Sequence, residues 1–199
     1  MVQAIETSYD GYKFRSRLEA RYAVFLKYLC IKYVYESEGF ELPSGRYLPD
    51  FWLPEFEMFI EVKDESKFES YYVGKSVRLY SEKYGRFVGF DFVYPYNREK
   101  TFARELALMT NYPVQIVYGD PLTELTRQLD SDDDRGGENE APIYFGDSQK
   151  CCLALMRPEN WLGDDYYGSR AKAMQPSLKK IWAAAKVARQ ARFEFGESG

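Results

Sequence analysis

The chain has no histidine among its 199 residues, and this absence excludes several common kinds of active site. Without an imidazole there is no Ser–His–Asp triad, no Cys–His dyad and no histidine-ligated zinc or nuclease centre. The three cysteines, Cys30, Cys151 and Cys152, form no Cys-x-x-Cys pair and lack the spacing of a zinc site. Cys151 and Cys152 are better interpreted as small buried hydrophobic residues of a protein in a reducing compartment.

Long apolar stretches are also missing. No run of about 18 apolar residues, the length that predicts a transmembrane helix, occurs in the chain. Residues 1–10 lack the basic and then apolar segments of a secretory signal peptide. We therefore expect a cytoplasmic protein with no membrane partner.

Aromatic side chains, in contrast, are abundant. They make up 18% of the residues, and 45% of the chain is hydrophobic, which is enough for a sizeable core. Eighteen Tyr and fourteen Phe are typical of strands and core edges, although stacking of exposed rings on nucleic-acid bases is an alternative. The length suits one α/β domain with an appendage.

The net charge is −4, but the two signs are unevenly distributed. Residues 130–140 hold six acids and one arginine, so the rest of the chain carries a net +1. This acidic run lacks the glycine and glutamate positions of an EF-hand loop and predicts a disordered linker. Basic residues that could contact phosphates form one set near the N-terminus, Lys13, Arg15, Arg17 and Arg21, and another near the C-terminus, Lys179, Lys180, Lys186, Arg189 and Arg192. A solvated helix face explains the second set equally well.

Two short segments place acids and a lysine within apolar sequence: Leu48-Pro49-Asp50-Phe51 and Ile60-Glu61-Val62-Lys63. Successive side chains of a strand point to opposite faces, so Glu61 and Lys63 share a face while Ile60 and Val62 serve the core. Residues 54–57 have the composition of a hairpin connection. Antiparallel pairing of the two segments would bring Asp50 alongside Glu61.

A third acid lies upstream, on a predicted helix. Residues 14–29 have the spacing of an amphipathic helix whose apolar stripe is Phe14, Leu18, Tyr22, Phe25 and Leu29. Glu19 flanks this stripe, and we expect it to point along the buried edge of the helix.

An Asp and a Glu beside a Lys are the minimum set for holding Mg²⁺ against a phosphodiester. Mg²⁺ takes oxygen ligands and needs only one or two carboxylates in addition to the substrate phosphate. A bound metal lowers the pKa of water, and a nearby ammonium stabilises developing negative charge. The ordinary interpretation uses the same residues: Glu61 and Lys63 as a strand ion pair, Asp50 as a turn cap, and Glu19 paired with Arg15 or Arg21.

The order of these elements resembles the PD-(D/E)XK nuclease superfamily, and more narrowly its small phage and prophage members. The matching stretches are residues 14–23 (FRSRLEARYA), 35–40 (YESEGF), 47–54 (YLPDFWLP), 61–63 (EVK) and 188–194 (ARQARFE). A PD…EVK pair alone recurs by chance, whereas the ordered set of helix, Gly-Phe segment and two strands is far more specific.

The resemblance implies a restriction-endonuclease-like α/β fold: an αβββαβ core, a central mixed sheet flanked by helices and a C-terminal helical tail. It also implies an Mg²⁺ site, with Mn²⁺ as a substitute, made by Asp50, Glu61 and the Val62 carbonyl. Glu19 would be a ligand or act through water, and Lys63 would activate the attacking water.

The activity implied is metal-dependent endonuclease cleavage of DNA, including branched or structured DNA in phage replication or recombination. Lys13, Arg15, Arg17 and Arg21 would contact that DNA. A homodimer would suit the cutting of two strands, and a phage-encoded enzyme would work in the cytoplasm of its bacterial host.

Along the chain we expect a core at residues 1–128, an acidic linker at 129–142 and a tail at 143–199. In the core, strands near 32–36, 39–42 and 47–53 precede the EVK strand. A helix at 99–109 and a strand at 113–118 are favoured over a helix at 69–84 as the last core pair, which makes 65–97 an insertion or an added sheet edge. The tail is expected to contain a strand near 141–145 and a basic amphipathic helix from about 176 to 193, docked on the core or on a second subunit.

Two alternatives to a nuclease stay open. One is a non-catalytic nucleic-acid-binding module on the same fold, and the other is a phage protein that engages host machinery on a nuclease scaffold. The intact set of Asp50, Glu61 and Lys63 favours the nuclease. Metal-dependent cleavage separates the nuclease from both alternatives, and salt-dependent DNA binding separates the alternatives from each other.

Overall fold

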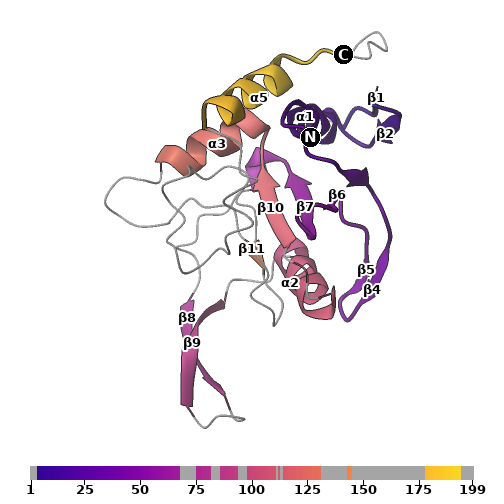
Figure 1. Ribbon diagram of the computed structural model, residues 1–199. Helices are drawn as coiled ribbons and strands as arrows, with labels where there is room; N and C mark the ends of the chain where they lie inside the picture. The colour runs from indigo at the N-terminus through magenta and orange to yellow at the C-terminus, as the bar shows by residue number, and fades with distance from the viewer. Residues whose placement is uncertain are drawn as a thin grey trace.

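A computed structural model of the chain describes residues 4–67, 75–81, 86–93, 98–110, 112, 114–130, 143–144 and 178–193 (Figure 1). The elements up to residue 67 are β1 (Thr7–Tyr9), β2 (Tyr12–Phe14), α1 (Arg17–Tyr28), β3 (Val34–Tyr35), β4 (Phe40–Leu42), β5 (Gly45–Tyr47), β6 (Phe51–Leu53), β7 (Met58–Lys63) and the 3₁₀ turn η1 (Glu65–Lys67). They are followed by β8 (Lys75–Ser81), β9 (Arg86–Val93), α2 (Arg98–Thr110), β10 (Val114–Tyr118), α3 (Pro121–Asp130), β11 (Ile143–Tyr144) and α5 (Leu178–Gln190).

The centre of the described fold is a mixed sheet with the strand order β11-β10-β7-β6-β3. Strands β7 and β10 are parallel, and the other neighbouring pairs are antiparallel. The crossover from β7 to β10 contains α2, as a parallel pair requires a long connection. The predicted α/β class, with a central mixed sheet flanked by helices, is confirmed.

Alternation along β7 divides the core into two layers. Met58, Ile60 and Val62 pack in a cluster with α1, α3 and α5, whereas Phe59 packs with α2 on the other face. Figure 1 shows the same division, with α1, α3 and α5 on one side of the sheet and α2 on the other. Glu61 and Lys63 alternate with Ile60 and Val62, so they lie on the face that α2 covers.

Helix α1 begins later than predicted. Ser16 caps it, and the Ser16 side chain accepts a hydrogen bond from the Glu19 N–H at 3.2 Å. Phe14, assigned from the sequence to the first helical turn, instead ends β2, although its side chain is fully buried as expected. The β1–β2 turn explains this, because Asp10 and Gly11 both have positive φ angles, as a tight two-residue hairpin requires.

The predicted strand at residues 47–53 is divided in two. Tyr47 belongs to β5, which pairs with β4 in a separate hairpin, whereas Phe51 begins β6 in the central sheet. The intervening Leu48-Pro49-Asp50 is not in a strand. Proline cannot donate a ladder hydrogen bond, which favours a break in pairing at this point.

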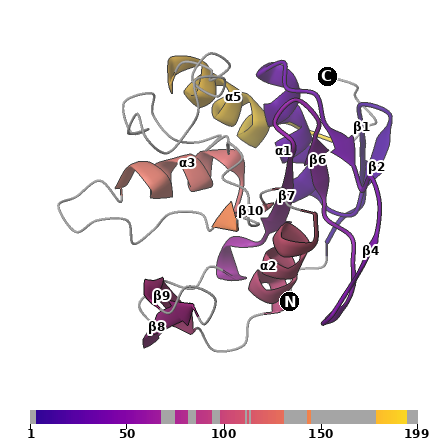
Figure 2. The ribbon, with the colours of Figure 1, turned by 60° about the horizontal axis from the view of Figure 1, so that its bottom comes forward.

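Residues 65–97 form no edge of the central sheet where they are described. Strands β8 and β9 pair with each other in an antiparallel hairpin that projects away from the sheet (Figures 1 and 2). The insertion interpretation therefore describes them better than an added sheet edge. The alternative helix at 69–84 is wrong where the structure describes it, because Lys75–Ser81 form the strand β8. The favoured helix at 99–109 and strand at 113–118 are confirmed as α2 and β10.

The tail contributes to the core rather than standing apart from it. Strand β11 pairs with β10, and α5 packs against α1 and α3 through the buried side chains of Ile181, Ala184, Ala185 and Ala188. Helix α3, which sequence reasoning missed, extends to Asp130 and so covers the first residues of the predicted linker. Residues 131–142 of that linker lie outside the described residues. Within the described part of the chain, every helix is too short or too polar to span a bilayer.

We expect Ile181→Ala to lower the free energy of unfolding by about 2–5 kcal/mol, because it leaves a cavity between α5 and the core. Ile181 is 1% exposed. Urea unfolding followed by circular dichroism measures the change. Val187→Ala is the matched control, since Val187 is on the same helix but 41% exposed. Equal losses in the two variants would mean that α5 does not dock as described.

Candidate functional site

Two buried carboxylates meet beside the β6–β7 hairpin. Phe51 pairs with Ile60, so Asp50, the residue before β6, lies beside Glu61, as the hairpin predicts. Asp50 is 4% exposed and Glu61 3% exposed. The backbone N–H of Val62 donates to Asp50 Oδ2 at 2.7 Å, which ties Asp50 to the strand that carries Glu61 and Lys63.

Lys63 lies on the same face of β7 as Glu61. Its Nζ donates to Glu61 Oε1 in an ion pair, and its side chain is 24% exposed, so the ammonium stays within reach of solvent. The other oxygen of Glu61, Oε2, accepts a hydrogen bond from the Tyr47 hydroxyl at 2.8 Å. Glu61 is therefore oriented from both sides.

Glu19 is buried in the first turn of α1, along the edge where the helical pattern placed it. Its Oε1 accepts from the Ser16 hydroxyl at 2.7 Å, and its Oε2 accepts from the Tyr35 hydroxyl and from the Arg15 backbone N–H. Both oxygens thus fix the segment that enters the helix. The ordinary interpretation paired Glu19 with the side chain of Arg15 or Arg21. Among the contacts of the described residues, Glu19 forms neither ion pair.

Arg15 bridges the site to a residue that sequence reasoning missed. Its Nη2 lies 3.1 Å from Asp50 Oδ1, and its Nε lies 2.5 Å from Glu36 Oε1. Glu36 has a φ of +46°, a conformation that is uncommon for residues other than glycine, and its backbone N–H donates to the Asp50 carbonyl at 2.9 Å. Strained backbone of this kind often lies at functional sites.

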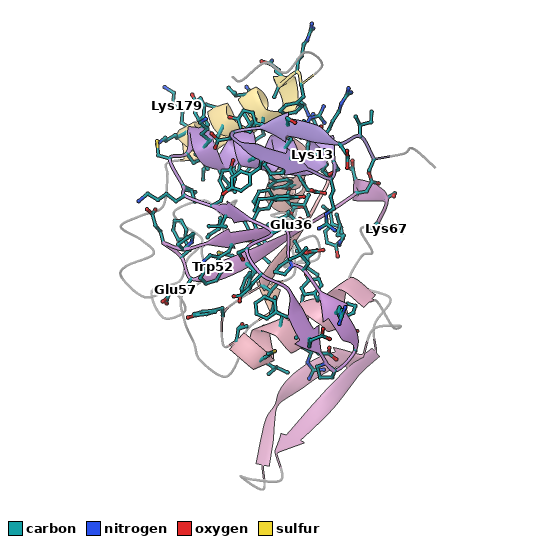
Figure 3. All side chains as sticks on the ribbon, turned by 90° about the vertical axis from the view of Figure 1, so that its right-hand side faces the viewer. Lys13, Glu36, Trp52, Glu57, Lys67 and Lys179 are labelled. Carbon is teal, nitrogen blue, oxygen red and sulfur yellow. The ribbon has the colours of Figure 1, made fainter. Side chains whose placement is uncertain are left out.

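Arg15, Glu19, Asp50 and Glu61 line one cavity of about 490 Å³. Its wall combines the three carboxylates with basic, aromatic and apolar residues: Ala4, Arg15, Ser16, Glu19, Arg46, Tyr47, Leu48, Asp50, Glu61, Val62, Lys63 and Phe102. Tyr47 stacks on Phe102 of α2, with ring centroids 5.2 Å apart, so the hydroxyl that binds Glu61 has a fixed position. In Figure 3 the labelled Glu36 lies near the centre of the molecule.

The carboxylates repel each other strongly. Burial raises the pKa of Asp50 well above its usual range, and the neighbouring charges of Glu61 and Glu19 raise it further. The Val62 N–H and the Lys63 ammonium act in the opposite direction but do not cancel these effects. A buried carboxylate with a raised pKa either takes up a proton or is stabilised as an anion by an additional cation.

Tyr35 and Tyr47 were not singled out from the sequence. Each donates its hydroxyl to one carboxylate, Tyr35 to Glu19 and Tyr47 to Glu61. Burial raises the pKa of Tyr35, and its bond to Glu19 adds to this, so the hydroxyl keeps its proton as a donor. The one signal in the sequence was their position at the start of the two matching stretches that contain Glu36 and Asp50.

The four basic residues predicted to contact nucleic acid do not gather in one place. Arg15 lies in the cavity with Asp50, whereas Arg17 and Arg21 line a different cavity, next to α5. Lys13 is on β2, and its exposed ammonium pairs with Glu6 at 2.6 Å. Lys13 lines neither of these cavities.

The donor set fits Mg²⁺ only with help from the substrate. Among the described residues, no group of three or more His, Cys, Asp or Glu side chains is arranged to hold a metal ion. All three carboxylates line the cavity, but Glu19 is held by the neutral hydroxyls of Ser16 and Tyr35, whereas Asp50 and Glu61 each pair with a cation, the charge that a metal ion would supply. Two carboxylates meet the usual requirement of Mg²⁺, which keeps several waters and takes further oxygens from a phosphate.

Comparison with models of known protein families, with curated proteins and with solved structures finds no match to this chain. What bears on its function is therefore the arrangement of Asp50, Glu61, Lys63 and Arg15 itself.

Proposed function

We propose that the chain is an Mg²⁺-dependent endonuclease that hydrolyses phosphodiester bonds in DNA. The observation that carries the proposal is the Asp50–Glu61–Lys63 arrangement, in which two almost fully buried carboxylates and a partly exposed ammonium share one cavity. Burying a carboxylate costs free energy unless a cation or hydrogen-bond donors pair with it. Groups in a cavity whose pKa is strongly perturbed are typical of functional sites.

The order of elements supports a PD-(D/E)XK-type, restriction-endonuclease-like core. Helix α1 is followed by β3, β6 and β7, then by α2 and β10, which is the αβββαβ order, and the β4–β5 and β8–β9 hairpins lie outside the central sheet. The two acidic positions lie at the β6–β7 hairpin and the lysine at the end of β7, where that superfamily has its motif.

Each residue then has a distinct part in the chemistry. Asp50 and Glu61 would bind the metal, which supplies a water of lowered pKa and neutralises the phosphate oxygens. The Lys63 ammonium, already directed at Glu61 Oε1, would orient the attacking water and stabilise negative charge on the oxygens of the phosphorane. Arg15 has a 56% exposed side chain and would exchange Asp50 for a phosphate oxygen of the substrate.

One observation favours the second candidate, a non-catalytic nucleic-acid-binding module. Arg15 and Lys63 already form ion pairs with Asp50 and Glu61 within the protein, so the cluster has cationic partners of its own. The raised pKa of Asp50 weighs against a purely structural cluster, because the two cations leave its negative charge undercompensated.

Cleavage assays on several substrates test the proposal. The purified chain is incubated with supercoiled plasmid, a four-way DNA junction, linear duplex, single-stranded DNA and RNA, in Mg²⁺, Mn²⁺ or EDTA. We expect cutting that requires metal, and the preferred substrate identifies the class. Binding without cutting under every condition would support the second candidate.

We expect Tyr47→Phe to weaken Mn²⁺ binding and to slow cleavage by about 10–100-fold, as is typical when an orienting hydrogen bond to a metal ligand is removed. The Tyr47 hydroxyl fixes Glu61 Oε2, and the phenylalanine ring keeps the stacking on Phe102. Calorimetric titration with Mn²⁺ measures the affinity. Tyr33→Phe is the control, since the Tyr33 hydroxyl bonds to exposed Asp10 instead. Unchanged Mn²⁺ affinity in Tyr47→Phe would exclude Glu61 as an oriented ligand.

A further inference from the structure

A second cavity, of about 610 Å³, lies between α1 and the C-terminal end of α5 and is lined by four arginines. Arg17 and Arg21 come from α1, and Arg189 and Arg192 come from the end of α5 and the residues after it. None of the described residues that line this cavity is acidic. We call it the arginine cavity, after these four side chains.

Two features of the fold bring these arginines together. Arg17 and Arg21 are four residues apart on α1, so they project from the same face of the helix. On α5, Arg189 is fixed by Asp120, with its Nη2 2.9 Å from Asp120 Oδ2, and by Thr123, whose Oγ1 accepts at 2.6 Å. This contact, together with the buried alanine face of α5, sets where Arg192 lies relative to α1.

The arginine cavity gathers four guanidinium groups and contains an unsatisfied donor. Asp120 compensates Arg189, but Arg192 is exposed and the cavity wall offers no carboxylate among the described residues. The Arg21 Nε is buried and has no hydrogen-bond acceptor in the described part of the protein. Guanidinium groups arranged in this way are suited to bidentate binding of phosphate oxygens.

We propose that the arginine cavity binds backbone phosphates of the nucleic acid whose cleavage is proposed above. The proposal rests on that function for the identity of the ligand, and it makes the C-terminal tail part of the nucleic-acid interface. Arginine contacts of this type position a duplex without reading its sequence. The arginine cavity thus explains why a basic tail helix is docked on the core.

The position of the arginine cavity relative to the carboxylates agrees with this role. Glu19, on the carboxylate side, lies between Arg17 and Arg21 in the sequence, so it projects from the opposite face of α1. The first two turns of α1 therefore carry residues of both places, so a nucleic acid bound at the N-terminal end of this helix would lie next to each of them.

Salt-dependent DNA binding tests the proposal. Fluorescence anisotropy of a labelled duplex is measured in EDTA, so that cleavage does not interfere, for the parent chain, Arg192→Gln and Arg17→Gln/Arg192→Gln. The control is Lys179→Gln, an exposed cation at the other end of α5 (Figure 3). Circular dichroism melting verifies that each variant is folded, and Arg192 lies after α5, where its loss does not disturb helix packing.

We expect each arginine lost to weaken binding by roughly tenfold at 0.1 M salt and to reduce the slope of log K against log salt by about 0.9. The control is expected to retain the parent slope. Parent-like slopes in both arginine variants, or no DNA binding by the parent chain, would overturn the proposal. Arginine-dependent binding without any metal-dependent cutting would leave the arginine cavity in place and refute the hydrolytic function instead.

Discussion

Asp50→Asn is expected to abolish metal-dependent cleavage and, at the same time, to raise the melting temperature of the metal-free chain. Both effects have one cause. Burial and the charges of Glu61 and Glu19 raise the pKa of Asp50, so its ionised form is unfavourable in the folded protein. The amide removes that charge and can still accept a hydrogen bond from the Val62 N–H, which the carboxylate accepts at 2.7 Å. A ligand that a metal needs is then lost, while the fold gains stability.

The sign of the pH dependence follows from the raised pKa. Folding increases the proton affinity of Asp50, so its cost to stability is fully present above the folded-state pKa and disappears as the pH falls below the unfolded value of about 3.9. Asp50→Asn is therefore expected to melt at a higher temperature than the parent at pH 8, and this difference should shrink steadily towards pH 4.

Melting curves for the parent and Asp50→Asn between pH 4 and pH 8 measure this difference. Asp64→Asn is the matched control, because hydrogen bonds from Ser66 lower the pKa of the exposed Asp64 carboxyl. The control should therefore gain no stability at pH 8. An Asp50→Asn chain that cleaves as fast as the parent would exclude Asp50 from the site, and one that melts lower at pH 8 would contradict the described electrostatics.

Lys63→Ala is expected to slow cleavage by about 10²–10³-fold, while the chain stays folded and loses far less in DNA affinity than in rate. The Lys63 side chain is 24% exposed, so its truncation leaves no large cavity, and Glu61 keeps its hydrogen bond from Tyr47. At most one phosphate contact is lost, which limits the loss of DNA affinity to roughly tenfold at 0.1 M salt. Single-turnover cleavage and anisotropy in EDTA measure the two quantities separately.

Lys67→Ala is the control for Lys63→Ala. Lys67 is exposed, lies on η1 four residues further along the chain and does not line the carboxylate cavity (Figure 3). Parent-like rates are expected for it. If the two lysine variants cleave equally fast, Lys63 does not act on the reaction, and the pairing with Glu61 is structural.

The part of the site on β6 and β7 could be predicted from the sequence because it depends on local rules. Alternation along Met58–Lys63 fixes which residues share a face, and the short connection between the strands fixes the register that brings Asp50 beside Glu61. The helical stripe likewise placed Glu19 at a buried edge. In each case, the relevant spacing lies within one element or across one tight hairpin.

The other contacts depend on chain geometry that no periodicity describes. Arg15 reaches Asp50 and Glu36 because the chain turns at Ser16 and because Glu36 adopts a positive φ. Tyr47 reaches Glu61 from a separate hairpin. These contacts join residues that are 14 to 35 positions apart in the chain. The periodicity of one helix or strand does not predict which residues of distant segments will meet.

The tail illustrates a related limit. Its apolar stripe predicts a buried helix face, and Ile181, Ala185 and Ala188 are buried as expected, but a stripe does not name the surface that covers it. The partner proved to be α1 and α3, and α3 itself was missed between the strand β10 and the acidic run. The Arg189 contact with Asp120 could not be anticipated without that helix.

The most direct test of the central claim is the rate of supercoiled plasmid nicking by the parent chain as Mg²⁺ is raised from zero in chelator-treated buffer, with Asp50→Asn measured in parallel. The account predicts no nicking without Mg²⁺, a rate that rises and saturates with Mg²⁺ for the parent, and none for Asp50→Asn at any concentration. Nicking that is independent of Mg²⁺, or equal in the two proteins, would contradict a metal-dependent nuclease site at Asp50 and Glu61.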